Sequence, residues 1–400
     1  MTGAEAVTLT ERYQMGNYAR FPLTFVRGEG SWLFDDLGKR YLDFLGGIAV
    51  ALLGHAHPAV TRAIAEQAGR LLHVSNLFHV PSQALLGERL SSATTGGKVF
   101  FCNSGTEANE AAIKLARKWS CDLRGPGRHE IVVVEGSFHG RTYGGLSATA
   151  QPKLHQGFEP MLPGFTTVPF GDAGALEAAL TDRVCAFFVE PIQGESGVRM
   201  HPPGYLKEAE GLCRRKGILF VADEIQTGMG RTGAFLSCGL SGVTPDIVTL
   251  AKGLANGLPL GAAVARDDVA AAFVPGTHGS TFGGNPVCCA AALAVLDVVT
   301  APGFRGDVVR KGERFMSGLT AIAERRTDVR EVRGAGLMVG LEMEGETKPV
   351  AARCLDAGLV VNAAAGNVLR FLPPLNVRDG EIDRALAILA AALPAEGRAA

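Results

Sequence analysis

The chain has 400 residues, which is enough for two or three domains around at least one sizeable core. Its 39 basic and 40 acidic residues give a net charge of −1. The molecule as a whole therefore has no charge excess that would attract it to nucleic acid or an anionic membrane. With 47% hydrophobic and 20% charged residues, the composition is that of a globular protein and excludes a disordered or fibrous chain.

The sequence also bears on compartment. No apolar run approaches the roughly 20 residues that a membrane-spanning helix needs. The segment 1–18 carries acidic residues and lacks the apolar core of a secretory signal. We therefore expect a cytoplasmic protein with no membrane contact. The eight cysteines are scattered without a CxxC spacing, so we expect reduced thiols and neither disulfides nor a metal site.

The pattern of apolar and polar residues divides the chain into three successive segments. Residues 31–50 alternate and turn at 36–38, which predicts a hairpin. From about 56 to 300, helical or loop segments separate short apolar runs rich in β-branched and aromatic residues, at 99–102, 131–135, 185–190, 218–223 and 247–251. This pattern predicts a mostly parallel α/β sheet.

The last hundred residues follow a different pattern. Amphipathic segments at 307–326 and 380–393 flank two possible strands at 339–343 and 367–371, which predicts a smaller α+β unit. We therefore divide the chain into an N-terminal segment (1–55) that contributes to the small domain, a large domain (56–300) and a C-terminal small domain (301–400).

A short polar loop, Asn103-Ser104-Gly105-Thr106, lies between the run at 99–102 and a segment with helical spacing of alanine and leucine. Such a loop opening a helix presents free N–H groups and the positive end of the helix dipole to a phosphate. By itself, a serine or threonine at this place is more often only a helix cap.

Two charged residues end apolar strand runs. Asp223 closes ILFVAD, and Lys252 follows IVTLA 29 residues later. The carboxyl ends of parallel strands face the ligand crevice, although each charge alone is more often a solvated strand end. With a phosphate site they supply what pyridoxal phosphate needs, namely an anchor, a lysine for the imine and a carboxylate for the ring nitrogen. Lys252 must lose its proton to react, and an apolar pocket lined by cations would lower its pKa.

Six motifs then occur in order: NSGTEANE (103–110), FHGRT (138–142), VEPIQGESG (189–197), ADEIQTGMGRTG (222–233), DIVTLAKGL (246–254) and HGSTFGGNP (278–286). Together they resemble the class III aminotransferases, specifically the acetylornithine aminotransferase branch, over about residues 18–370. The resemblance implies the type I pyridoxal-phosphate-dependent transferase fold, in which both chain ends build the small domain. It also implies a homodimer with active sites at the interface.

The resemblance implies roles for individual residues. Lys252 would be the Schiff-base lysine and proton carrier, and Asp223 the partner of the ring nitrogen. The other implied cofactor contacts are Ser104, Gly105 and Thr106 on the phosphate, Phe138 on the ring face, His139 at the cofactor edge, Gln226 at the 3-oxygen, and Thr281 on the phosphate from the other subunit.

The implied substrate residues include a switch. Arg370 would hold the α-carboxylate of glutamate, and Glu195 would pair with Arg370 when the ω-amino substrate is bound. Arginine suits this task because its guanidinium binds carboxylates bidentately. The remaining implied substrate contacts are Arg141 and Tyr18 near the donor carboxylate and Ser280 beside the substrate.

The implied reaction moves the ω-amino group of N2-acetyl-L-ornithine to 2-oxoglutarate, a step of arginine biosynthesis. Ile48 stands where free-ornithine enzymes tend to have a tyrosine, and Tyr18 argues against 4-aminobutyrate, which has no α-carboxylate. The open alternatives are N-succinyldiaminopimelate, N-succinylornithine, free ornithine and 4-aminobutyrate.

Other functions have weaker support. The segment 228–233 matches G-x-G-x-x-G, but a nicotinamide-dependent oxidoreductase also needs a helix opening on the third glycine and an acid ending the next strand, which the sequence lacks. A non-catalytic binding protein on this fold would require loss of Lys252. His55 and His57 have no nearby ligands to complete a site, so we expect no metal.

Overall fold

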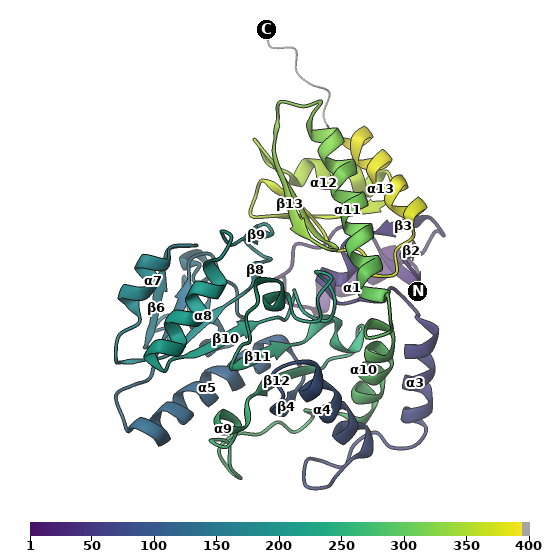
Figure 1. Ribbon diagram of the computed structural model, residues 1–400. Helices are drawn as coiled ribbons and strands as arrows, with labels where there is room; N and C mark the ends of the chain where they lie inside the picture. The colour runs from purple at the N-terminus through teal and green to yellow at the C-terminus, as the bar shows by residue number, and fades with distance from the viewer. Residues whose placement is uncertain (394–400) are drawn as a thin grey trace.

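A computed structural model describes residues 1–393, so residues 394–400 of the predicted C-terminal domain lie outside the described residues. Figure 1 shows two parts: a larger one built on a central sheet, and a smaller one above it that carries the C-terminal sheet and helices. The N-terminal strands lie beside the C-terminal elements of the smaller part.

The central sheet has seven strands in the order β4-β12-β11-β10-β7-β5-β6. Their bounds are β4 Lys98–Cys102, β5 Glu130–Val134, β6 Phe165–Val168, β7 Val184–Val189, β10 Leu219–Asp223, β11 Ile247–Leu250 and β12 Gly261–Ala265. Only β12 runs antiparallel to its neighbours, so the predicted mostly parallel sheet is confirmed. The five predicted strand runs all form strands of this sheet.

Strand β12 is absent from the sequence prediction. Its sequence, GAAVA, has one β-branched residue and no polar alternation, so it carries little strand signal. Its small residues match its place, because a Cβ at Gly261 would lie 2.3 Å from the carbonyl oxygen of Ser104. The strand therefore allows the chain at the start of α5 to approach the sheet closely.

Helices cover this sheet. The longest, α5 (Gly105–Arg124), is capped by the Ser104 hydroxyl, and its buried positions recur at helical spacing against the sheet. The others of the N-terminal and large parts are α1 Gly3–Tyr13, α2 Gly46–Ala49, α3 Pro58–Ala68, α4 Pro81–Ala93, α6 Tyr143–Ala148, α7 Ala173–Ala179, α8 Tyr205–Lys216, α9 Asp267–Ala270 and α10 Pro286–Val299.

Both ends of the chain contribute to the smaller part. The predicted hairpin is formed by β2 (Trp32–Asp35) and β3 (Arg40–Asp43), which join β1 (Phe25–Glu29), and β3 pairs in parallel with β15 (Leu359–Val360). A second sheet has the order β13-β14-β17-β16. Its strands and the covering helices are β13 Val329–Ala335, β14 Met338–Met343, β16 Asn362–Ala364, β17 Val368–Phe371, α11 Phe304–Ala323, α12 Lys348–Asp356 and α13 Asp379–Ala392. The divisions at residues 55 and 300 stay a prediction.

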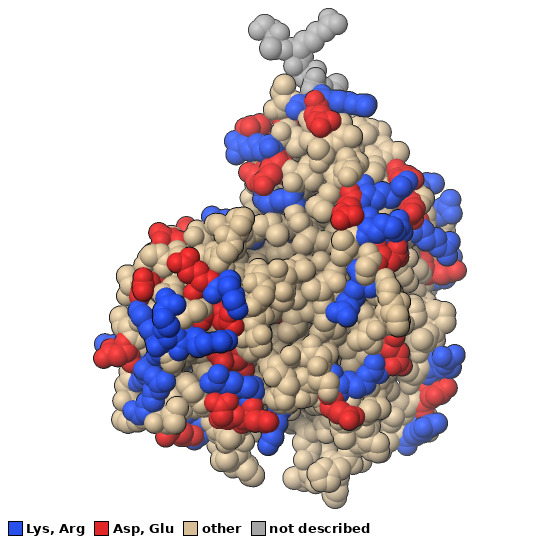
Figure 2. Space-filling model, in the orientation of Figure 1, with Lys and Arg blue, Asp and Glu red and all other residues tan. Residues whose placement is uncertain are grey.

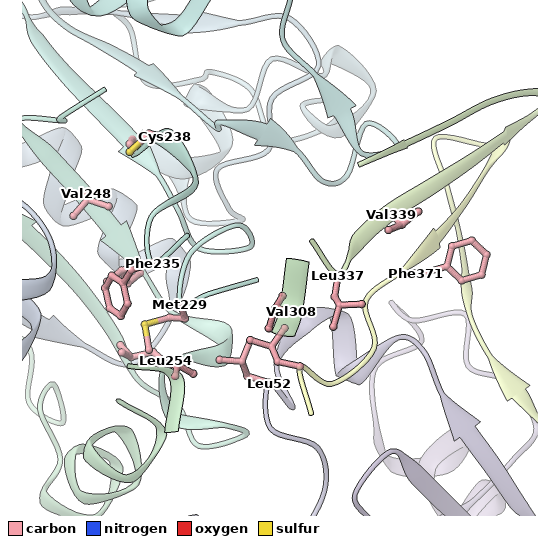
Figure 3. Close-up of a cluster of buried hydrophobic side chains, with 14 of the residues drawn as sticks. Leu52, Met229, Phe235, Cys238, Val248, Leu254, Val308, Leu337, Val339 and Phe371 are labelled. Atoms are coloured by element: carbon pink, nitrogen blue, oxygen red, sulfur yellow. The ribbon is translucent and has the colours of Figure 1, made fainter. Parts of the chain in front are cut away.

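One hydrophobic core connects the two parts. Figure 3 shows it running from Val248 on the central sheet past Met229 and Leu52 to Val339 and Phe371 on the C-terminal sheet. All five side chains are buried. Because full burial of such a side chain stabilises the fold by about 1.5–3 kcal/mol, this continuous contact holds the C-terminal sheet against the larger part.

Over residues 1–393, no single helix is both long and apolar enough to span a bilayer; α10 and α11 together reach that length and composition, with a 73° bend between them. Figure 2 shows basic and acidic side chains interspersed along the margins of one face, around a largely uncharged centre. All eight cysteines are free thiols, and seven of them are buried.

Candidate active site

A cavity of about 230 Å³ lies at the carboxyl edge of the central sheet. It forms where β10 and β11, which are parallel neighbours, end close to the beginning of α5. The cavity brings together most of the predicted cofactor residues. Its lining is Gly105, Thr106, Asn109, Phe138, His139, Gly140, Arg141, Glu190, Asp223, Ile225, Gln226 and Lys252.

The first turn of α5 forms one wall. The N–H groups of Gly105 and Thr106 have no acceptor within the described part of the chain, as expected for the first turn of a helix. The Thr106 hydroxyl contacts the Thr142 hydroxyl at 2.7 Å. Gly140 packs on Thr106 so closely that a Cβ would lie 2.2 Å from its hydroxyl oxygen, and its φ of +127° is unfavourable for other residues. This wall can hold an anion through backbone donors.

Asp223 is held in a fixed orientation by three donors. Its Oδ2 accepts from Asn109 Nδ2 and from His139 Nδ1, both at 2.8 Å, and its Oδ1 accepts from the N–H of Ile225 at 3.1 Å. The carboxylate can only accept, so Nδ1 of His139 carries the hydrogen. The His139 ring stacks on Phe188 at 4.3 Å, which fixes the imidazole as well. The structure thus places a buried, oriented carboxylate in the cavity.

Lys252 follows β11 and faces the same cavity. Its φ of +47° is in the left-handed region, a strained conformation that is frequent at functional sites. Its amine has no hydrogen-bond or ion-pair partner within residues 1–393. Burial lowers the pKa of Lys252, and the carboxylates of Glu195 and Asp223 oppose the shift. A lowered pKa increases the share of neutral amine, which is the nucleophilic form.

A second acid, Glu190, lies in the cavity and was not predicted. Its Oε2 accepts from the N–H of Phe138 at 3.0 Å, which fixes the loop that carries the aromatic ring. Burial, reinforced by the charge of Asp223, raises the pKa of Glu190 well above its usual range. In this cavity the charged form of Glu190 is therefore disfavoured. The guanidinium of Arg141 lies 5.5 Å from the ring centroid of Phe138.

The predicted pair of Arg370 and Glu195 is present beside the cavity. Arg370, on β17, is 1% exposed, and its Nη1 donates to Glu195 Oε1 at 2.6 Å and to Gln226 Oε1 at 3.1 Å. Gln226 Nε2 donates to the same Glu195 oxygen at 3.2 Å. Burial alone would raise the pKa of Glu195, but Arg370 holds it below its usual range. Glu195 is thus an ionised group that occupies the guanidinium.

Besides Glu195 and Arg370, four more predicted residues lie outside the lining of this cavity. Ser104 caps α5, and its hydroxyl contacts the Glu107 carboxylate at 3.0 Å. Ser280 binds Asn103 and lines a different cavity, while Thr281 is exposed. Tyr18 is exposed on the N-terminal segment, 5.2 Å from the guanidinium of Arg20. The roles predicted for these residues stay predictions.

Two residues of the lining were not predicted, although their positions in the sequence indicate them. Asn109 is four positions after Gly105, so it lies one helical turn along the same face of α5. Glu190 directly follows the fully buried strand β7, at the same sheet edge as Asp223. Polar residues at carboxyl ends of buried strands are candidate site residues for that reason.

The other motifs have local roles. His55 Nε2 contacts Asp43 at 2.8 Å, and His57 precedes α3. The described residues contain no group of three or more His, Cys, Asp or Glu that could hold a metal. Residues 228–233 form turns after β10, and no helix opens on Gly233, which is the helix that a dinucleotide site needs.

With this geometry established, comparison with known proteins identifies the family. The family model described as "Aminotransferase class-III" matches residues 13–393. The chain belongs to the class III aminotransferases. Members of this family use pyridoxal phosphate, and the residues here fit that group: free backbone donors for a phosphate, an oriented carboxylate and an unpaired lysine with a lowered pKa share one cavity.

Individual relatives are similar over nearly their full length. The chain is 49% identical to the acetylornithine aminotransferase of Caldanaerobacter subterraneus, covering 96% of this chain and 98% of that protein. It is 48% identical to the one from Methanopyrus kandleri, covering 98% and 100%. The fold matches the ornithine aminotransferase of Toxoplasma gondii with a TM-score of 0.94 at 36% identity, covering 98% and 95%. It also matches acetylornithine aminotransferase from Elizabethkingia anophelis with a TM-score of 0.88 at 33% identity, covering 98% and 99%.

Proposed function

We propose that this class III aminotransferase moves the ω-amino group of N2-acetyl-L-ornithine to 2-oxoglutarate, giving N-acetyl-L-glutamate 5-semialdehyde and L-glutamate. The observation that carries the choice of donor is the 48–49% identity, over almost the whole chain, to proteins named acetylornithine aminotransferase. The pathway would be arginine biosynthesis.

The cavity residues account for the chemistry. Pyridoxal phosphate, when bound, supplies an electron sink for the carbanion formed at the amine-bearing carbon. The first-turn N–H groups of α5 would bind its phosphate, and Asp223 would keep the ring nitrogen protonated, because a nearby negative charge favours the charged form. Phe138 would cover the ring face. Lys252 would form the covalent link and move the proton, since burial lowers the pKa of its amine.

The pair of Glu195 and Arg370 supports the use of two different substrates. While Glu195 occupies Arg370, this guanidinium is not free for a substrate carboxylate, which suits a donor whose reacting end is an amine. When Glu195 moves away, Arg370 becomes a bidentate site for the α-carboxylate of glutamate or 2-oxoglutarate. One pocket thereby serves both halves of a ping-pong cycle.

Ile48 would lie beside the acyl group of the donor. Residues 46–49 all have positive φ, and this turn holds the Ile48 side chain 38% exposed. A Cβ at Gly46 would lie 3.0 Å from the carbonyl oxygen of Leu372, so the turn packs against the chain just after Arg370. An apolar side chain at this place suits an acylated α-nitrogen, which carries no positive charge.

The donor assignment is tested by following the visible absorption of the holoenzyme after adding one amine at a time. We expect N-acetylornithine to convert the cofactor to its amine form with a second-order rate constant at least about tenfold higher than that of any other amine. The other amines are free ornithine, N-succinylornithine, N-succinyldiaminopimelate and 4-aminobutyrate. The reason is that a misfitted polar group or a missing contact costs about 1.4 kcal/mol or more. Faster conversion by any of the other four amines would replace the proposed donor.

We further propose that the enzyme is a homodimer. An apolar surface is formed by Leu72, Leu77, Phe78, Leu85 and Phe282, all of which are exposed, Leu77 by 83%. Asn76 joins its two segments by donating to the carbonyls of Ser280 and Gly283. An exposed apolar patch of this kind marks an interface. Thr281 lies in the same loop, so a second copy covering this surface would bring Thr281 to the partner's phosphate site.

The dimer is tested with the double variant Leu77→Asp/Phe282→Asp and the control Leu240→Asp, another leucine that is 58% exposed but lies on a 3₁₀ turn outside the surface. We expect the double variant to sediment as a monomer. It should bind the cofactor about tenfold more weakly, because it loses roughly one hydrogen bond to a charged group. Leu240→Asp should behave as wild type. A monomeric wild type, or a double variant that stays dimeric, would contradict the proposal.

A further inference from the structure

The loop that carries Glu195 is held by an arginine that has no assigned role. The loop, residues 194–198, connects β8 (Ile192–Gln193) to β9 (Arg199–Met200). Arg333, on β13, donates from Nε to the carbonyls of Gly197 at 3.2 Å and Val198 at 3.0 Å, and from Nη2 to the carbonyl of Gly197 at 2.8 Å. Its Nη1 is held by Glu331 at 2.6 Å and by Glu342.

This arginine is in register with Arg370. Across the C-terminal sheet, Arg333 pairs with Gly340, Gly340 with Arg370, and Arg370 with Asn362. Directly opposed residues project from the same face of a sheet, so both arginines reach out from that face. Between them Gly340 leaves a gap, and the loop fills it: a Cβ at Gly340 would lie 3.2 Å from Val198 Cβ and 3.3 Å from the Gly197 carbonyl oxygen.

The loop conformation itself needs support. Val198 has a φ of +54°, a left-handed conformation that is strained for a β-branched residue. Its side chain is fully buried with Ile192, Met338 and Leu372. The planar guanidinium of Arg333 satisfies the carbonyls of the strained turn, which a lysine ammonium cannot do with the same geometry.

Glu195 is two residues before Gly197, so the hold on the loop limits where its carboxylate can go. On the other side, the Ser196 hydroxyl donates to the carbonyl of Gly136 at 2.5 Å. We propose that Arg333 is a positioning residue that, together with the gap at Gly340, holds the 194–198 loop in the place where Glu195 meets Arg370, and so sets the balance between the amine-donor and the dicarboxylate states of the site. This inference rests on the proposed function.

The consequence is an opposite effect on the two substrates. If the loop is released, Glu195 occupies Arg370 less often, and the guanidinium is more available to a carboxylate. Ligands that need a free Arg370 should therefore bind more tightly. Donors that need the occupied guanidinium should bind more weakly. A general loss of structure would weaken both.

The test uses Arg333→Lys, with Arg330→Lys as the matched control, because Arg330 lies on the same strand and pairs with Glu342 and Glu344 without a contact to the loop. Calorimetry measures binding of glutarate, a dicarboxylate without an amino group, to the holoenzyme. We expect glutarate to bind about threefold or more tightly to Arg333→Lys and the KM for N-acetylornithine to rise about three- to tenfold, with both unchanged in Arg330→Lys. Arg370→Met should abolish glutarate binding.

Gly340→Ala gives an independent variant that keeps Arg333 and displaces the loop by its added methyl group; we expect shifts in the same directions. Unchanged glutarate affinity in both variants, parallel weakening of glutarate and donor, or an equal shift in Arg330→Lys would overturn the proposal. The glutarate measurement requires no amine donor. A wild type that rejects N-acetylornithine would therefore refute the proposed substrate without deciding the role of Arg333.

Discussion

Replacing Lys252 with alanine is expected to lower turnover by about 10⁴-fold or more, the upper range for loss of a proton-transfer group. The structure gives the reason: Lys252 is the amine that lies in the cavity with Asp223, and burial lowers its pKa so that it can act as nucleophile and base. Steady-state rates and the mass of the chain after borohydride treatment measure the effect. Wild type should retain the cofactor covalently after reduction, and Lys252→Ala should not.

Lys252→Arg provides the matched control. It keeps a cation of similar length, but a guanidinium stays protonated near neutral pH and cannot take over the proton transfer. We expect it to be as inactive as the alanine variant. Substantial turnover in either variant, or a borohydride-stable cofactor in Lys252→Ala, would show that another residue carries the reaction.

Asp223→Asn is expected to lower the rate of the first half-reaction by about 10²–10³-fold, the usual cost of removing one oriented electrostatic group. The amide has nearly the same shape but no charge to hold a proton on the ring nitrogen. If its oxygen keeps the bonds from Asn109 and His139, its NH₂ group faces the N–H of Ile225, so donor meets donor. Rapid mixing with N-acetylornithine, followed by absorbance, measures the rate.

Asp246→Asn serves as the comparison, because Asp246 is a carboxylate just before β11, at the opposite end of this strand from Lys252. Asp246 accepts from the N–H of Phe220 and pairs with Arg266, so its replacement affects stability. We expect the half-reaction of folded Asp246→Asn to stay within about twofold of wild type, because Asp246 does not line the cavity. Equal losses in both variants would count against a role for Asp223 at the ring nitrogen.

Site residues were predictable where a short motif places them at the end of a strand or the start of a helix. Asp223 and Lys252 each end a run of buried apolar residues, and parallel strands bring such ends to one edge, as β10 and β11 do. The place of Gly105 and Thr106 at the start of α5 was predictable as well, because they open a helix with a clear amphipathic pattern. Local sequence is sufficient here because strand ends and helix starts have fixed polarity.

Other features depend on contacts between distant segments. Asn109 and His139 meet at Asp223 from positions 114 and 84 residues away. The strand GAAVA of β12 gains its conformation from its neighbours and has little strand signal of its own. Tyr18 and Thr281, predicted at the site, are exposed in the single chain, and their place depends on what covers that surface.

The amino-acid sequence by itself determined the family, the cofactor chemistry and the two residues at the sheet edge, because these reside in short motifs whose spacing reflects local structure. Only the tertiary structure decided that burial beside Asp223 raises the pKa of Glu190 and that Arg333 donates to the loop of Glu195. The physical reason is that burial and close contacts arise when segments distant in the sequence pack together, as Arg333 and Gly197 do across 136 residues. Desolvation and close carbonyl contacts exist only after that packing has formed.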